Sequence, residues 1–126
     1  MKLTETTDKK KTGFDGEEYA AEYLVSKGYI ILDRNHQSGR VELDIVARKD
    51  NWLVFVEVKT RFGDFAYPER AVGKQKQRNL QVAAEIYMDK RNIDAQARFD
   101  IVAIVIGKGR PQVEHFEDAF YPFKTY

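Results

Sequence analysis

Two acidic residues and a lysine lie on two consecutive segments whose composition is typical of β-strands. Asp44 lies in the segment 41–48, and Glu57 and Lys59 lie in the segment 52–60. Both segments are rich in β-branched or aromatic residues, which favour strands. The short polar segment between them favours a tight turn. We therefore expect an antiparallel hairpin that carries all three side chains.

The register of this hairpin decides whether the acidic side chains meet. With a two-residue turn at residues 50–51, residues whose numbers sum to 101 face each other. Asp44 then lies opposite Glu57, and Glu42 lies opposite Lys59. A four-residue turn gives the same register, whereas a three-residue turn places Asp44 and Glu57 on opposite faces of the hairpin.

Opposed carboxylates on a sheet repel each other, and burial makes the repulsion more costly. A divalent cation removes this cost, and hard oxygen ligands of this kind favour Mg²⁺ or Mn²⁺. The alternative is simple salt bridging, in which Asp44 or Glu57 pairs with Lys59 or with an arginine.

A third acidic residue, Glu17, favours the cation. We expect a helix that begins near Asp15, which forms a capping pair with Glu18, and that ends near Gly28. The helix carries an apolar stripe made of Ala20, Ala21, Leu24 and Val25. Glu17 lies one turn before this stripe, so its side chain is predicted on the inward face.

The remaining segments predict a mixed α/β sheet with helices packed against it. A second helix is expected from residue 69 or 73 to residue 89, with an inward stripe of Leu80, Ala83, Ala84, Tyr87 and Met88. Because it connects two strands, a parallel crossover is expected. The other predicted segments are a strand at 29–33, a polar loop at 34–40, an irregular loop at 61–68, a strand at 99–106 buried on both faces, and an edge strand at 111–116.

Length and composition predict one domain. The chain has 126 residues and no cysteine, which excludes disulfides and cysteine-based zinc sites. Residues 1–11 are polar and charged and are expected to form a flexible tail, followed by a single domain over 12–126. The sequence shows neither an apolar run that would span a membrane nor an apolar signal core, so a soluble cytoplasmic protein is expected.

The net charge of +1 does not by itself indicate a nucleic-acid-binding protein, but basic residues are clustered. Arg70, Lys74, Lys76 and Arg78 lie in a stretch without acidic residues, which suits a phosphate backbone. The alternative is a solvated helix face. Lys76 also lies one turn before Leu80 on the inward stripe, which suggests a phosphate contact beside the metal unless its side chain extends into solvent.

The loop at 61–68 adds a second candidate contact for nucleic acid. It combines Arg61 with the aromatic residues Phe62, Phe65 and Tyr67. Arginine and exposed aromatic rings stack on unpaired bases. The alternative is that these rings cover the core.

The order of these residues resembles a known nuclease signature. Asp44 followed by Glu57-Val58-Lys59 on the next strand is similar to the motif of PD-(D/E)XK nucleases, which have the restriction-endonuclease-like fold. Glu17 resembles an extra glutamate of archaeal Holliday-junction resolvases. The stretches GEEYAAEYLVSKGYIILDRN, VELDIVA, WLVFVEVKTR and RFDIVAIV, with the helix that contains Lys76, resemble the YraN family of bacterial proteins more closely. That family has glycine where this chain has Val41.

The resemblance implies a role for each matching residue. Asp44, Glu57 and the Val58 carbonyl would ligate Mg²⁺ or Mn²⁺, with Glu17 as a direct or water-mediated ligand. Lys59 would orient the attacking water and stabilise negative charge in the transition state. Glu42 would hold Lys59 or support the ligands. A homodimer is implied by analogy with resolvases.

Two functions therefore remain open at this stage. The first is a metal-dependent endonuclease that hydrolyses phosphodiester bonds in DNA, including branched or recombination intermediates. The second is a non-catalytic module that binds nucleic acid or protein and retains the nuclease fold. A nucleophile triad is not expected, because the chain has no cysteine and only two histidines, His36 and His115. Both histidines are predicted at the surface.

Overall fold

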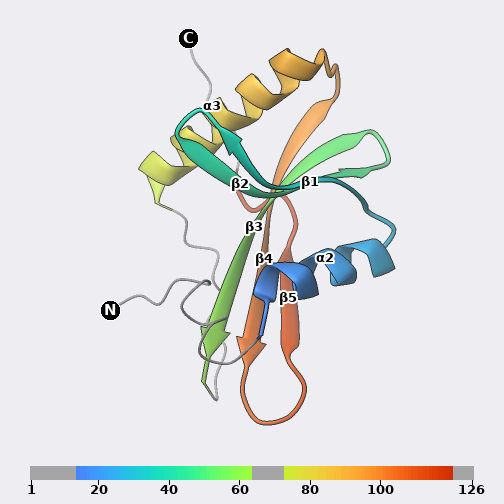
Figure 1. Cartoon of the computed structure of the whole chain (residues 1–126), viewed down its shortest axis with the longest axis vertical. Helices are drawn as coiled ribbons and strands as arrows, with labels where there is room; N and C mark the ends of the chain where they lie inside the picture. Colours follow the sequence, from blue (N-terminus) through green and yellow to red (C-terminus); the bar gives the residue numbers. More distant parts are fainter. Residues whose placement is uncertain (1–13, 64–72, 121–126) are drawn as a thin grey trace.

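The computed structural model describes residues 14–63 and 73–120 (Figure 1). The elements within these residues are α2 (Gly16–Ser26), β1 (Ile30–Ser38), β2 (Val41–Lys49), β3 (Trp52–Phe62), α3 (Lys74–Arg91), β4 (Gln96–Ile106) and β5 (Gln112–Phe116). The tail predicted at 1–11, and the part of the predicted loop from residue 64 to 68, lie outside the described residues. The division into a tail and one domain stays a prediction.

The fold is α/β, with one mixed sheet in the strand order β1-β2-β3-β4-β5. β3 and β4 pair in parallel, as expected for two strands joined through α3, and the other neighbours pair antiparallel. This arrangement is consistent with a restriction-endonuclease-like fold. In the described part of the chain, neither helix combines the length and apolar character that a membrane span requires.

The two helices cover opposite faces of the sheet, and each face has its own core (Figure 1). α2 packs over one cluster, which includes Ala20, Ala21, Leu24, Ile45, Val54, Val56, Val58, Val102 and Ile104. α3 packs over the other, which includes Leu43, Val46, Leu53, Phe55, Leu80, Ala83, Ala84, Tyr87, Phe99 and Ile101. The near-continuous burial of β4 follows from its position between these layers.

The predicted helix ends agree closely with the structure. Asp15 caps α2 by accepting a hydrogen bond from the Glu18 N–H at 3.2 Å. The predicted inward stripe of α3 is confirmed, with Met88 partly buried beside the others. The stripe of α2 is confirmed except at Val25, which was wrongly predicted inward and is 56 % exposed.

The first strand is longer than predicted. Residues 34–38 were predicted to lie in a polar loop, but they form the second half of β1 and pair with residues 41–45 of β2. Asn35, within this part of β1, has a positive φ of 51°. Asparagine tolerates this conformation better than most residues, which allows an irregular strand in a polar sequence. This half of β1 was predicted as a loop because β1 is an edge strand with few buried residues, so its sequence is polar.

β2 and β3 separate in the middle of the sheet. The two-residue turn and the register that sums to 101 are confirmed, since Lys49 pairs with Trp52 and Ile45 pairs with Val56. The pairing runs from the turn as far as Ile45 and does not include Asp44, and the two strands diverge from there (Figure 1). In a regular strand Leu43 would share a face with Ile45, but it joins the α3-side core, so β2 rotates between these two residues.

A buried polar network joins β4 to β5 and to the start of β1. Asp100, which is 1 % exposed, accepts two hydrogen bonds from Arg98 and one from the Asp118 N–H. Its Oδ2 lies 2.7 Å from Nε2 of His115, and Arg98 also donates to the hydroxyl of Tyr29 at 2.6 Å. His115 was wrongly predicted at the surface, because its side chain is 7 % exposed.

This network governs the protonation of Asp100. Burial alone would raise its pKa, but the hydrogen bonds from His115, Arg98 and Asp118 outweigh burial and lower the pKa below the ordinary 3.8. A carboxyl group whose pKa is lowered in the folded state stabilises the fold above its unfolded pKa. That stabilisation is lost as the pH falls through the folded pKa.

We expect Asp100→Asn to lower the free energy of unfolding by about 3 kcal/mol at pH 7, because it leaves the Arg98 charge buried without its main partner. The difference from wild type should shrink as the pH falls below about 4, where wild type also loses the charge. Denaturant titrations at several pH values measure both effects. Asp94→Asn, at an exposed position, is the matched control, and an equal effect of the two substitutions would contradict this account.

Candidate metal centre

Acidic side chains from two elements meet where β2 separates from β3. One carboxylate oxygen from each of Glu17, Glu42 and Asp44 can be chosen so that all three lie within 4.8 Å of one another. Glu17 comes from the first turn of α2, and the other two come from β2. The divergence of the strands thus leaves room for a helix to bring a third carboxylate to Asp44.

Glu17 is held in an environment that opposes its charge. Burial raises its pKa, as do the negative charges of Glu42 and Asp15, while a hydrogen bond from Asn35 and the charge of Arg34 lower it; the net direction is upward. Within the described residues, Glu17 Oε1 is buried and has no hydrogen-bond partner. A buried carboxylate oxygen without a partner costs free energy, and a cation is the group that would satisfy it.

Asp44 is anchored to β3 through the backbone. Its Oδ2 accepts a hydrogen bond from the Val58 N–H at 2.9 Å. The N–H and C=O of one strand residue point toward the same neighbouring strand. The Val58 carbonyl therefore points to the side on which Asp44 lies. The expected ladder pair between Asp44 and Glu57 is replaced by this side-chain bond.

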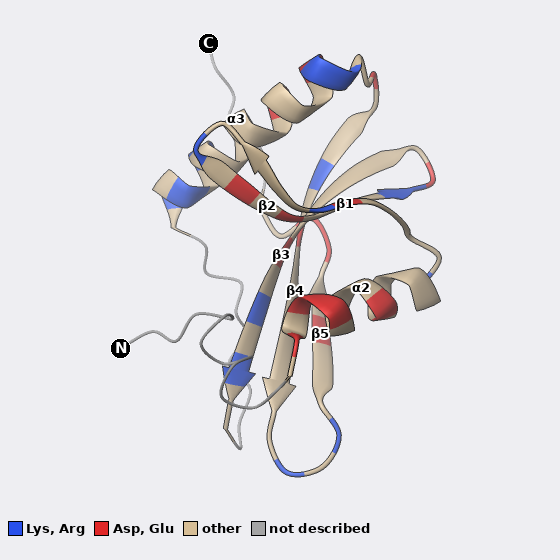
Figure 2. Ribbon diagram, in the orientation of Figure 1, with Lys and Arg blue, Asp and Glu red and all other residues tan. Residues whose placement is uncertain are grey.

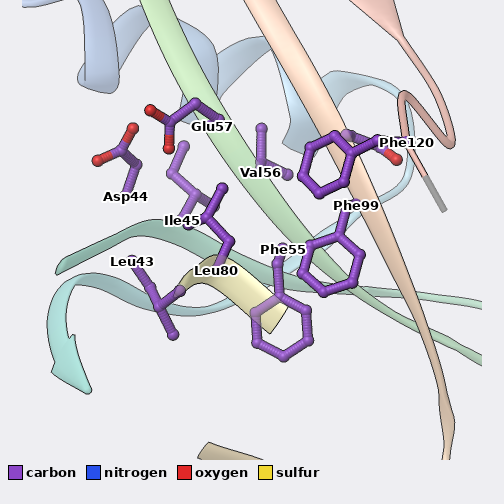
Figure 3. Close-up of a pocket in the computed structure, with 10 residues that line it drawn as sticks. Leu43, Asp44, Ile45, Phe55, Val56, Glu57, Leu80, Phe99 and Phe120 are labelled. Carbon is purple, nitrogen blue, oxygen red and sulfur yellow. The ribbon is translucent and has the colours of Figure 1, made fainter. Parts of the chain in front are cut away.

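Glu57 lines the same small cavity as Asp44, but it is not a member of the 4.8 Å group and is paired with a lysine from α3. Figure 3 shows the two carboxylates close together above a set of apolar side chains that includes Ile45 and Leu80. Oε2 of Glu57 lies 2.5 Å from Nζ of Lys76. The side chain of Glu57 is only 12 % exposed, whereas that of Lys76 is 46 % exposed. The sequence placed both residues near the site but did not predict this ion pair.

The cavity beneath the two carboxylates is small. Its volume is about 10 Å³, close to the space of one water molecule. The lining is largely apolar and includes Leu43, Phe55, Phe99 and Phe120. A nucleotide does not fit into this space, so any extended substrate must approach the carboxylates from the surface.

The basic residues predicted from the sequence fall on two elements. Lys59 follows Glu57 on the same face of β3 and is partly buried, and Arg61 lies nearer the strand end, where it donates to the Thr60 carbonyl. Lys74 and Arg78 are exposed in the first part of α3. Figure 2 shows basic residues along the lower half of β3 and acidic residues on β2 and at the start of α2.

Sequence reasoning missed two residues that position Glu17. Gly16 is buried at the start of α2, and a Cβ atom there would lie 2.1 Å from Oγ1 of Thr60. Thr60 is 6 % exposed and lies two residues beyond Val58 on the α2 side of β3. The absence of a side chain at residue 16 thus lets α2 approach β3 closely. The signal was the glycine before Glu17, inside a predicted helix.

Asn35 is the third residue that was missed. It lay in the segment predicted as a polar loop, yet its side chain bonds Glu17. It lies on β1 between Arg34, which pairs with Ile45, and His36, which pairs with Leu43, and it has a positive φ. Asn35 is therefore the β1 neighbour of Asp44 by register, which explains how one side chain reaches the acidic group.

The donor set suits a hard divalent cation. Carboxylate oxygens and a backbone carbonyl are the ligands that Mg²⁺ and Mn²⁺ prefer. The group formed by the described residues Glu17, Glu42 and Asp44 offers neither sulfur nor imidazole. The partnerless Glu17 oxygen and the mutual repulsion of the three carboxylates are both relieved by such an ion. The residues present therefore fit the ion that the sequence motif implies.

Fold and site together define a class: an α/β domain with a restriction-endonuclease-like sheet and an acidic group at its strand divergence. The family is given by sequence comparison. The model of the family described as Uncharacterised protein family UPF0102 matches residues 16–104. The chain belongs to this family, which is the YraN family that its motifs resemble.

Several relatives are similar over most of their length. The UPF0102 protein of Phocaeicola vulgatus is 46 % identical over 111 residues, which cover 87 % of this chain and 92 % of the relative. That of Rhodococcus jostii is 47 % identical over 86 % of this chain and 94 % of the relative. That of Syntrophotalea carbinolica is 49 % identical over 83 % and 87 %.

We expect Gly16→Ala to lower the free energy of unfolding by about 2 kcal/mol, because the added methyl group overlaps Thr60 Oγ1. Thr60→Ala removes that oxygen, and the Cβ atom that remains at residue 60 lies 3.4 Å from the Cβ atom added at residue 16. The double variant should therefore recover most of the lost stability. Denaturant titration of the two single variants and the double variant measures the coupling.

Gly73→Ala is the control for this pair, because a Cβ atom at Gly73 meets no other atom within 4 Å. Strictly additive effects of Gly16→Ala and Thr60→Ala would show that the close approach of α2 to β3 does not depend on these two residues.

Proposed function

We propose that this protein is a metal-dependent endonuclease that hydrolyses phosphodiester bonds in DNA. The observation that carries the proposal is the group of Glu17, Glu42 and Asp44 within 4.8 Å, with a buried Glu17 oxygen that has no partner among the described residues. Repulsion without a counterion makes this arrangement unfavourable. A fold that holds these carboxylates together therefore gains the most stability when a cation is bound to them.

The ligands would be Asp44, Glu17 and Glu57, together with the Val58 carbonyl that faces the same side. Glu42 is one of the three members of the 4.8 Å group, and its carboxylate either binds the ion directly or orders the other ligands, whereas Glu57 would join from β3. When bound, Mg²⁺ or Mn²⁺ would polarise the phosphate and lower the pKa of a bound water.

The side chains of β3 complete the chemistry. Hydrolysis adds water across a phosphorus–oxygen bond, so negative charge increases on the phosphate oxygens in the transition state. Lys59, on the same face as Glu57, carries a positive charge that stabilises this charge and orients the attacking water. Its position on a paired strand of the central sheet keeps it in place relative to Asp44.

The exposed cations suit a polyanionic substrate. Lys74 and Arg78 on α3, with Arg61 at the end of β3, lie on the two elements that also supply Lys76 and Glu57. Contacts from Lys and Arg to phosphates give affinity without reading sequence. Because the cavity below the carboxylates is far smaller than a nucleotide, the backbone would bind across the surface.

The test is cleavage of single-stranded, duplex and branched DNA with Mg²⁺ or Mn²⁺. We expect Asp44→Asn to lower the rate by about 100-fold or more, since it removes a ligand charge. Asparagine retains an acceptor for the Val58 N–H and relieves one repulsion, so the variant should be at least as stable as wild type in chelator. This separates loss of activity from loss of folding.

Asp89→Asn is the matched control, because Asp89 is exposed in the last part of α3. Equal trace cleavage by wild type and Asp44→Asn on every DNA would sink the nuclease proposal. Salt-sensitive binding without turnover, unchanged in Lys59→Met, would instead support the non-catalytic module.

A further inference from the structure

The ion pair between Lys76 and Glu57 joins the first turn of α3 to the candidate metal centre. It links Nζ to Oε2 at 2.5 Å, and the carboxylate end is 12 % exposed while the lysine is 46 % exposed. A carboxylate buried to this degree requires a counterion. In the described structure the ammonium of Lys76 fulfils this requirement at Glu57.

The position of Lys76 at the start of α3 allows its side chain to move away from Glu57. It lies four residues before Leu80, the first buried residue of α3, and therefore one turn beyond the core on the same side of the helix. Its neighbours Lys74 and Gln75 are exposed, and the helix cap at Gly73 makes no side-chain hydrogen bond. A flexible four-carbon side chain in this setting is able to move while the helix stays packed.

The charges at the site make the two cations alternatives. Glu57 and Asp44 line the same cavity (Figure 3), so a divalent ion bound to Glu57 would share this carboxylate with the Lys76 ammonium, which lies 2.5 Å from its Oε2, and the two positive charges would repel each other at short range. The repulsion between these cations opposes simultaneous binding.

We propose that Lys76 is the resident counterion of Glu57 and that a divalent ion displaces it when the metal centre fills. This inference rests on the proposed function, because it assigns a competitor to the same centre. Lys76 neutralises Glu57 before the ion binds, which lowers the apparent affinity for the ion. Once displaced, its ammonium becomes available to a phosphate oxygen, so that metal and substrate binding are coupled.

Calorimetric titration of the full chain with Mn²⁺ tests the exchange. Lys76→Met keeps the aliphatic length and removes the competitor, so we expect Mn²⁺ to bind about fivefold more tightly than to wild type. Lys74→Met removes the same charge from the same helical turn but not the Glu57 contact, and it should change the affinity by less than about twofold.

Thermal unfolding gives a second readout without nucleic acid. In chelator, Lys76→Met should melt at a lower temperature than Lys74→Met, because Glu57 has lost its counterion. Saturating Mn²⁺ should remove this difference. Binding by the Lys76→Met variant alone would support the exchange in its strongest form, in which the lysine excludes the ion.

The remaining outcomes separate the two proposals. If wild type binds Mn²⁺ and Lys76→Met binds it equally or more weakly, the exchange is wrong and the metal centre stands. If neither wild type nor the variants bind Mn²⁺, the metal centre is wrong and the exchange is wrong with it.

Discussion

The central constraint on this molecule is the repulsion between carboxylates held together at the divergence of β2 and β3. Glu17, Glu42 and Asp44 approach within 4.8 Å, and Glu57 lines the same cavity as Asp44 (Figure 3). Each of these groups is more stable in water than beside its neighbours. The sheet, the helix start and the surrounding cations therefore have to compensate for a site that is unfavourable without a counterion.

Four local features of the scaffold maintain the arrangement. The closeness of Gly16 to Thr60 sets how near the start of α2 lies to β3. Asp15, the residue before Gly16, caps the helix and so fixes where it begins. Asn35, in an uncommon backbone conformation, provides a hydrogen bond to Glu17. From α3, Lys76 neutralises Glu57. Short-range packing and two polar partners thus oppose a repulsion that acts over several ångströms.

The sequence predicted those parts of the fold that depend on local patterns. The hairpin register followed from turn length, and the inward face of α3 followed from helical periodicity. It did not predict the second half of β1, because a polar edge strand with an irregular residue such as Asn35 resembles a loop. The Lys76–Glu57 pair joins residues 19 positions apart on different elements, and no periodic pattern indicates a long-range contact of that kind. The assignment of site residues rests on a motif, whereas the ligand geometry depends on how far β2 rotates between Leu43 and Ile45.

The most direct measurement is a crystal structure of the protein grown with Mn²⁺, with an anomalous difference map calculated at the manganese absorption edge. The account predicts a peak bonded to Asp44 and to at least one other of the named carboxylates, with Lys76 moved away from Glu57. An ordered site at millimolar Mn²⁺ that shows no anomalous peak, with the acidic side chains turned away from one another, would contradict it.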